Sequence, residues 1–378
     1  MSTHAVLSPS SAARWMTCPG SVTLSEGIED IGSSNANEGT MMHGFAAKCL
    51  ETATYAKAHI GEVDKDTGLT LTETQAVDVQ KYVDYVWDIC EHTGGTLLIE
   101  QRLPIAWMTG EKGASGTADA VIITPDELIV IDAKFGFKTV DAIENHQLMM
   151  YAAAAYDQHS IAHDFKGIRV CIVQPRLNAT PEWTLSPEEL LFFVDEVKFA
   201  AEQTRIETEQ YVPSEKGCQW CRAKPICPAI KANVLRDFET VVPETADEDD
   251  LARVMSKANL IESWVKAIRA EVERRLMAGT PVAGYKLVQG KRGNRKWVNP
   301  DDAEATLKSM RVKHDQMYDY SLASPTSIEK LVKAEEIGPR QWVKIQELIT
   351  QSEGTPSVAH ESDKRPALSL AASISDFD

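Results

Sequence analysis

Two aspartates in one stretch of this chain have the types and spacing of a divalent-cation site. Residues 116–134 read GTADAVIITPDELIVIDAK, two apolar runs joined by a Thr-Pro-Asp turn, which is typical of a β-hairpin. Asp119 lies on the first run and Asp132 near the end of the second, where a buried carboxylate is costly unless it is paired or bound to a metal. With the turn at 124–127, both fall toward the open end of the hairpin, where Mg²⁺ or Mn²⁺ would remove their repulsion.

Lys134 follows Asp132 by two residues, so strand periodicity places both side chains on one face. Ala133 faces the other way and offers its backbone carbonyl. An ammonium at this position could orient a water molecule and stabilise charge that develops on phosphorus. The alternative is a surface hairpin whose charges are merely solvated.

The order of an aspartate and then a strand that ends in Asp-x-Lys resembles the PD-(D/E)XK nuclease superfamily. Two further motifs resemble its RecB-like branch: NEGTMMHGFAA at 37–47, which places His43 on a predicted helix, and QLMMY at 147–151, a Q-x-x-x-Y motif. Gln147 and Tyr151 are four residues apart and therefore share one helix face. A structural histidine and a core tyrosine are the alternatives.

The resemblance implies an α/β fold with a restriction-endonuclease-like core, in which helices flank a mixed central sheet. It implies a metal-dependent DNA nuclease that hydrolyses phosphodiester bonds, an exonuclease rather than an endonuclease, acting on DNA ends or single strands in phage or bacterial recombination. The implied metal ligands, for Mg²⁺ or Mn²⁺, are His43, Asp119, Asp132 and the Ala133 carbonyl. The implied catalytic residues are Asp119, Asp132, Lys134, Gln147, Tyr151 and Glu100, the last of which a solvated strand charge explains nearly as well.

Four cysteines have the spacing of a second metal centre. Cys218, Cys221 and Cys227 form a C-x₂-C-x₅-C motif, and a C-x₂-C pair can grip one metal. The best fourth ligand is Cys18, which is expected in a loop, whereas the other cysteines, Cys49, Cys90 and Cys171, lie in apolar patterns typical of core thiols. This arrangement resembles the CRISPR-associated RecB-like iron–sulfur exonucleases and their phage-encoded relatives, which implies a [4Fe–4S] cluster; Zn²⁺ is the competing occupant.

The spacing of apolar residues predicts the elements that must position these groups. Helices are expected near 38–50, 76–90, 141–158 and 187–209, and strands at 96–103, 116–123, 128–134 and 167–175. Three consecutive strands, a helix and a further strand predict a mixed sheet that begins as a meander and continues through a helical crossover.

The chain is expected to divide into a nuclease domain at 1–235, an accessory region at 251–351 and a disordered tail at 352–378. The accessory region should be smaller and mainly helical, with a long helix at 251–278 and a basic hairpin at 284–298. Within that hairpin Lys291, Arg292, Arg295 and Lys296 could contact DNA, although a plain solvated turn explains them as well.

Composition limits the class of protein. The 378 residues are 43% hydrophobic and 25% charged, as in soluble globular proteins, and the net charge of −17 counts mildly against a nucleic-acid binder. Neither a signal-peptide pattern nor an apolar run of about 18 residues is present, so we expect no membrane association and a location in the cytosol, of a bacterial host if the protein is phage-encoded. A recombination partner protein is possible, and the oligomeric state is left open.

Two other functions fit the sequence. The chain could be a DNA- or protein-binding module that keeps the fold and the metal cluster but has lost catalysis, or a zinc hydrolase whose thiolates carry the chemistry.

Overall fold

The computed structural model describes residues 5–28, 34–206, 210–240, 248–286, 288, 300–310, 313, 325–334, 336–346 and 348–349. The chain divides into two compact units, Met1–Val288 and Gln289–Asp378. The predicted division at residues 235 and 251 stays a prediction. The predicted tail at 352–378 lies outside the described residues.

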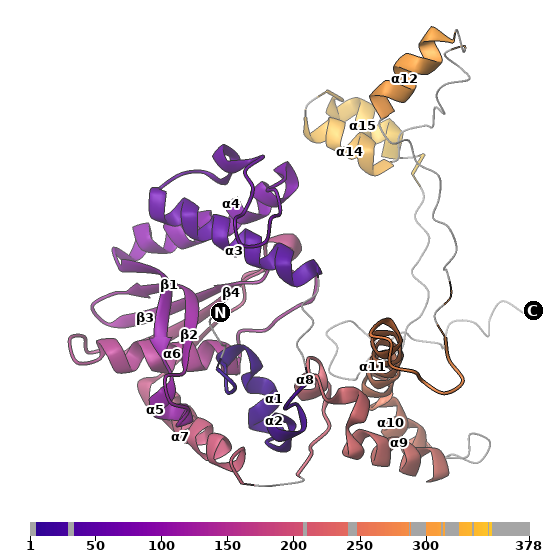
Figure 1. Cartoon of the computed structure of the whole chain (residues 1–378). Helices are drawn as coiled ribbons and strands as arrows, with labels where there is room; N and C mark the ends of the chain where they lie inside the picture. Colours follow the sequence, from indigo (N-terminus) through magenta and orange to yellow (C-terminus); the bar gives the residue numbers. More distant parts are fainter. Residues whose placement is uncertain are drawn as a thin grey trace, which may run out of the picture. The chain divides into compact units, whose positions relative to one another are not determined.

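A five-stranded mixed sheet forms the centre of the first unit (Figure 1). Its strands, in spatial and sequence order, are β1 (Thr96–Pro104), β2 (Ser115–Ile123), β3 (Glu127–Ala133), β4 (Gly167–Val173) and β5 (Glu182–Leu185). The first three pair antiparallel, β3 and β4 pair parallel, and β4 and β5 pair antiparallel. The predicted meander and the helical crossover to β4 are therefore confirmed, and the fold is α/β.

Helices cover both faces of this sheet. Successive side chains of a strand point to opposite faces, and here both faces are apolar and must be buried. Ile129 and Ile131 belong to one buried cluster, with residues of α3 (Ser34–Thr52) and α4 (Glu73–Thr93). Figure 1 shows these two helices together on one side of the strands.

The opposite surface of the sheet faces a second helical layer. Leu128 and Val130 belong to the other buried cluster, with residues of α1 (Ala12–Thr17), α6 (His146–His159) and α7 (Pro187–Gln203). The sheet is therefore buried on both faces between these layers.

Local signals fix where several of these helices begin. Thr72 and Gln75 form a capping box at the start of α4, and Ser186 and Glu189 form another at the start of α7. The side chain of Asn145 accepts hydrogen bonds from the first amides of α6, so this helix begins at residue 146 rather than at the predicted 141.

Two sequence-based expectations about elements were wrong. Strand β5 was not predicted, because it is only four residues long and lies at the edge of the sheet. The helix predicted at 251–278 is two helices, α10 (Glu248–Met255) and α11 (Ala258–Met277). At the break the Ser256 hydroxyl donates to the carbonyl of Arg253, which competes with the helical pattern.

The remaining elements are short connections and the helices of the C-terminal part. The first unit also contains η1 (Pro9–Ser11), α2 (Gly20–Leu24), η2 (Ala56–His59), α5 (Ala106–Thr109), η3 (Pro175–Leu177), α8 (Glu215–Cys218), η4 (Lys224–Ile226) and α9 (Pro228–Thr240). The described part of the second unit contains α12 (Pro300–Ser309), α14 (Pro325–Lys333) and α15 (Pro339–Gln346). Within the described ranges, no helix combines the length and the apolar character that a membrane crossing requires.

Candidate functional site

The β2–β3 ladder stops where its two aspartates begin. Its last backbone pair is Ala120 with Ile131, and the next position would bring Asp119 opposite Asp132. There the Asp119 carboxylate takes the place of a backbone partner, since its Oδ2 accepts a hydrogen bond of 2.7 Å from the amide of Ala133. The register of the hairpin therefore brings both carboxylates to its open end, where the sequence predicted them.

His43 reaches Asp119 from helix α3. Its Nδ1 lies 3.1 Å from Oδ1 of Asp119, although the two residues are far apart in the sequence. The buried Phe135 ring packs edge-on against the imidazole at a centroid distance of 5.2 Å, which fixes its orientation. Sequence reasoning did not identify Phe135; its signal was an aromatic residue directly after the Asp-x-Lys motif.

Lys134 and helix α6 complete the other side of the site. Nζ of Lys134 lies 2.8 Å from Oδ2 of Asp132 and donates a 3.0 Å hydrogen bond to Oε1 of Gln147. The Gln147 amide in turn donates to Oδ1 of Asp132 at 3.2 Å and to the Tyr151 hydroxyl at 3.3 Å. The expectations that Asp132 and Lys134 share a face and that Gln147 and Tyr151 point to one place both agree with these contacts.

The two aspartates have opposite electrostatic surroundings. Burial favours the neutral form of Asp119, but His43, together with the Ala133 amide and Lys134, outweighs it, so the pKa of that carboxyl is lowered. Burial dominates at Asp132 and raises its pKa, although Lys134 opposes the shift. The Asp132 carboxylate also raises the pKa of Lys134 against the effect of burial, and Asp119 raises the pKa of His43 in the same way. The attraction within each pair thus favours the charged forms of its two members.

Glu100 lies across from Asp119 at the one gap in the β1–β2 ladder. The pairs Ile99 with Ala120 and Gln101 with Ala118 flank this gap, and Glu100 has a φ of 45°, a left-handed conformation that is strained for a glutamate. Partial desolvation and then repulsion by Asp119 raise the pKa of Glu100 to about 7, although the residue as a whole is solvent-exposed. Glu100 therefore lies near the carboxylates, as predicted.

Tyr82 is a site residue that sequence reasoning missed. It lies on α4, is 1% exposed, and its hydroxyl has no hydrogen-bond partner among the described residues. Burial and then the charges of Asp119 and Asp132 raise its pKa, so the hydroxyl faces the carboxylates. The only signal in the sequence was a hydroxyl-bearing tyrosine among the apolar residues on the buried face of α4.

The donor atoms of the site are of the kinds that a divalent cation binds. Oδ2 of Asp132 is buried and lies 2.8 Å from the Lys134 ammonium, so its charge is compensated inside the protein. Two carboxylates and an imidazole are among the ligand types that Mg²⁺ and Mn²⁺ take in proteins. In the described part of the chain, however, no three His, Cys, Asp or Glu side chains stand at metal-holding spacing.

The four predicted cluster cysteines line one small cavity. Cys18, at the end of α1, meets Cys218, Cys221 and Cys227, which follow it by about 200 positions. Backbone amides are aimed at two of the sulfurs, from Val212 to Cys18 at 3.3 Å and from Ser214 to Cys218 at 3.4 Å. Desolvation raises the pKa of both thiols despite these amides.

Two basic residues stand beside these sulfurs. Lys224 lines the same cavity, is 7% exposed and donates to the Gln219 carbonyl at 2.9 Å and to the Ser263 hydroxyl at 2.6 Å. Arg14 is close enough for the sulfurs of Cys221 and Cys18 to affect its pKa, which burial lowers. Four sulfurs, amide donors and nearby cations suit a thiolate-bound metal centre. Of the three expected core thiols, Cys49 and Cys171 are fully buried, whereas Cys90 is only half-buried against the core.

The four predicted DNA-contacting residues, Lys291, Arg292, Arg295 and Lys296, lie outside the described residues, so this expectation stays a prediction. Beside the cysteines, the Trp220 side chain is 81% exposed and Lys224 is buried.

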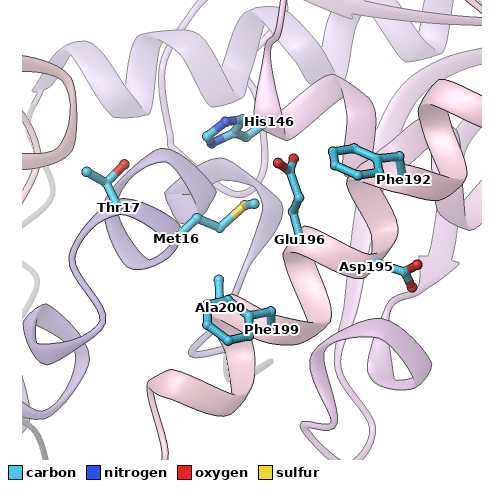
Figure 2. Close-up of a pocket in the computed structure, with 8 residues that line it drawn as sticks. All are labelled: Met16, Thr17, His146, Phe192, Asp195, Glu196, Phe199 and Ala200. Atoms are coloured by element: carbon cyan, nitrogen blue, oxygen red, sulfur yellow. The ribbon is translucent and has the colours of Figure 1, made fainter.

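A separate hollow lies between helices α1 and α7 (Figure 2). Met16, Thr17, His146, Phe192, Asp195, Glu196, Phe199 and Ala200 line it, and Figure 2 shows Glu196 extending toward His146. The two carboxylates give it negative charge, so this hollow does not suit a phosphodiester strand. It contains neither of the site aspartates.

Two comparisons with known proteins bear on this chain. A solved structure described as "Crystal structure of SSO0001" is 13% identical and covers 56% of this chain and 95% of its own; at its TM-score of 0.25 it does not identify a shared fold. Residues 4–366 match the family described as "Protein of unknown function (DUF2800)". Because this match extends over nearly the whole sequence, the chain belongs to the DUF2800 family.

Proposed function

We propose that this chain is a Mg²⁺- or Mn²⁺-dependent deoxyribonuclease with a restriction-endonuclease-like core of the RecB-like type, and that it acts as an exonuclease on DNA ends. One observation carries the proposal: two contact groups, drawn from four separate segments, meet at the end of β2 and β3. His43 contacts Asp119, and Asp132 contacts Lys134 and Gln147. The hydrogen bond from the Ala133 amide to Asp119 links the two groups.

The proposed ligands are His43, Asp119, Asp132 and the Ala133 carbonyl. When bound, the divalent cations supply Lewis-acid stabilisation of charge on the phosphate and on the leaving oxygen. His43 and Asp119 already contact each other, which places two of the proposed ligand groups side by side.

Lys134 is the proposed catalytic side chain, and its ammonium group supplies positive charge in addition to the divalent cations. It would orient the attacking water and stabilise the charge that develops on the scissile phosphate. Gln147 bridges Lys134 and Asp132, and Tyr151 holds the Gln147 amide, so these two residues position the ammonium. Glu100 would add an acidic group beside Asp119.

The cysteine cavity has a structural role in this proposal. We propose a [4Fe–4S] cluster on Cys18, Cys218, Cys221 and Cys227, which would tie the N-terminal segment to the chain beyond α7. Zn²⁺ is the alternative occupant. Iron and zinc analysis of anaerobically purified protein, with its visible absorption spectrum, distinguishes the two.

The function is tested by digesting end-labelled single- and double-stranded DNA with anaerobically purified protein in Mg²⁺, Mn²⁺ or chelator. Asp132→Asn and Lys134→Met should each reduce cleavage at least about 100-fold, because the first removes a proposed metal ligand and the second removes the ammonium proposed to act on the phosphate. Asp126→Asn is the matched control, since Asp126 is exposed at the turn of the same hairpin.

Two outcomes would contradict the proposal. Cleavage by Asp132→Asn protein at the wild-type rate would exclude this site. Wild-type protein that binds DNA but cuts none under any metal condition would instead indicate a non-catalytic binding module.

A further inference from the structure

The loop after β3 holds an aromatic ring out in solvent next to the candidate site. Phe137 is 75% exposed, yet the loop around it is fixed by the buried Gln174 side chain. Gln174 donates to the Lys138 carbonyl at 2.8 Å and accepts from the Val140 amide at 2.9 Å. Phe137 is therefore exposed although its loop is held in place by hydrogen bonds. Keeping this apolar ring in water costs free energy.

One side of the Phe137 ring rests on a guanidinium that is itself anchored. Arg176 Cζ lies 4.8 Å from the ring centroid. The guanidinium is held by Glu38 at 2.7 Å and by Asp78 at 3.4 Å, and its side chain is 12% exposed. A cation–π contact of this kind fixes the plane of the ring and leaves its other face open.

The loop that carries this ring begins directly after the strand end that carries Asp132 and Lys134. Phe137 follows Lys134 by three residues, and Nη2 of Arg176 lies 3.5 Å from the sulfur of Met42, the residue before His43. Both components of the stack are therefore attached to segments that carry site residues.

We propose that Phe137, supported by Arg176, is a stacking platform for one unpaired nucleobase of a DNA strand whose phosphate occupies the Asp119–Asp132 site. This inference rests on the proposed function and names its substrate class, a single strand or a frayed end. Inside a duplex both faces of a base are covered by its neighbours, so a base offers a free face to the ring only in an unpaired strand or at a strand end.

The test measures binding of a fluorescent single-stranded oligonucleotide by anisotropy in chelator, where cleavage does not proceed. Phe137→Ala should weaken binding about ten-fold, which corresponds to the loss of one base–aromatic stack. Phe137→Leu should lose nearly as much, because it keeps apolar area without a ring, whereas Phe137→Trp should bind like wild type. Thermal unfolding checks that each variant is folded.

A second measurement identifies the ligand as a base. In this measurement a single abasic site is placed at a different position in each of a set of strands. At one position the wild-type protein should bind about ten-fold more weakly than it binds the intact strand. Phe137→Ala should bind that strand and the intact strand equally. Phe199→Ala, which removes an exposed ring in the acidic hollow, should change neither affinity.

Kinetics separate a failure of this inference from a failure of the proposed function. With Mn²⁺, Phe137→Ala should raise KM for single strands and leave kcat within about two-fold. If the wild-type protein cuts DNA and the Phe137→Ala variant keeps the wild-type affinity and KM, the stacking role is wrong but the proposed function stands. Wild type that neither binds nor cuts DNA would overturn both.

Discussion

Each aspartate in the site is paired with a cationic side chain from a different direction. His43 approaches Asp119 from α3, and Lys134 approaches Asp132 from the same strand. These pairs explain how two acidic groups tolerate burial at the end of one hairpin, since an unpaired buried charge costs several kcal/mol. Within each pair the cationic partner favours the ionised carboxylate, and at Asp132 it does so against a burial effect that raises the pKa of the carboxyl.

Arg176 should stabilise the protein in a pH-dependent way. Its hydrogen bond and that of Gln75 lower the pKa of Glu38, so the stabilisation is present above the ordinary glutamate pKa and is lost as the pH falls through the lowered value. Arg176→Met should therefore cost roughly 2 kcal/mol in the free energy of unfolding at pH 7 and less below about pH 4.

Urea unfolding at several pH values checks this expectation. Lys166→Met, which breaks an exposed ion pair with Asp164, is the control and should change little at any pH. An Arg176→Met cost that is constant from pH 7 to pH 3 would contradict the role of Glu38.

Tyr82→Phe should leave stability unchanged or raise it by up to about 1 kcal/mol. The hydroxyl is buried with no described partner, so the wild-type protein already bears the cost of desolvating it. Tyr151→Phe is the comparison, because that hydroxyl accepts a hydrogen bond from Gln147 and its loss should destabilise by about 1 kcal/mol. Thermal unfolding of both variants in chelator decides the matter; a larger loss for Tyr82→Phe than for Tyr151→Phe would be inconsistent with an unpartnered hydroxyl.

At the scale of elements, the capping box of α7 offers a direct test of how local signals fix a helix. Ser186 accepts from the Glu189 amide, and the Glu189 side chain accepts from the Ser186 amide. Ser186→Ala should cost about 1 kcal/mol of unfolding free energy, measured by chemical denaturation. Ser160→Ala, at the C-terminal end of α6, should cost much less; equal losses would show that the cap is not the cause.

Much of the fold and part of the site could be predicted from the sequence, because both depend on local pattern. Short apolar runs on either side of a turn define β2 and β3, and the two-residue spacing of Asp132 and Lys134 fixes their shared face. Strand β5 could not be predicted from its four residues, since pairing with β4 supplies its stability. The roles of Tyr82 and Phe135 depend on contacts between α3, α4 and the strand end, which no local spacing encodes.

At the scale of the whole first unit, the cysteine cavity joins segments that are about 200 positions apart. A metal centre held there closes a very long loop, so its contribution to folding should be large. Cys18→Ser should lose most of the bound metal and at least about 3 kcal/mol of stability, the size expected for a cross-link over such a loop.

Metal analysis and thermal unfolding of the purified protein check this prediction. Cys90→Ser is the matched control, because Cys90 is half-buried on α4, away from the cavity, and should keep full metal content. Normal metal content in Cys18→Ser protein would remove Cys18 from the ligand set.

The left-handed conformation of Glu100 also affects how strand β1 can pair at the edge of the sheet. This strand is nine residues long and outermost in the strand order, the position at which a foreign polypeptide could add itself. The left-handed turn at Glu100 divides that rim into two short stretches, and Pro104 at its end has no amide to donate. The same distortion that places Glu100 opposite Asp119 thus leaves a shorter regular edge on which a foreign strand could pair.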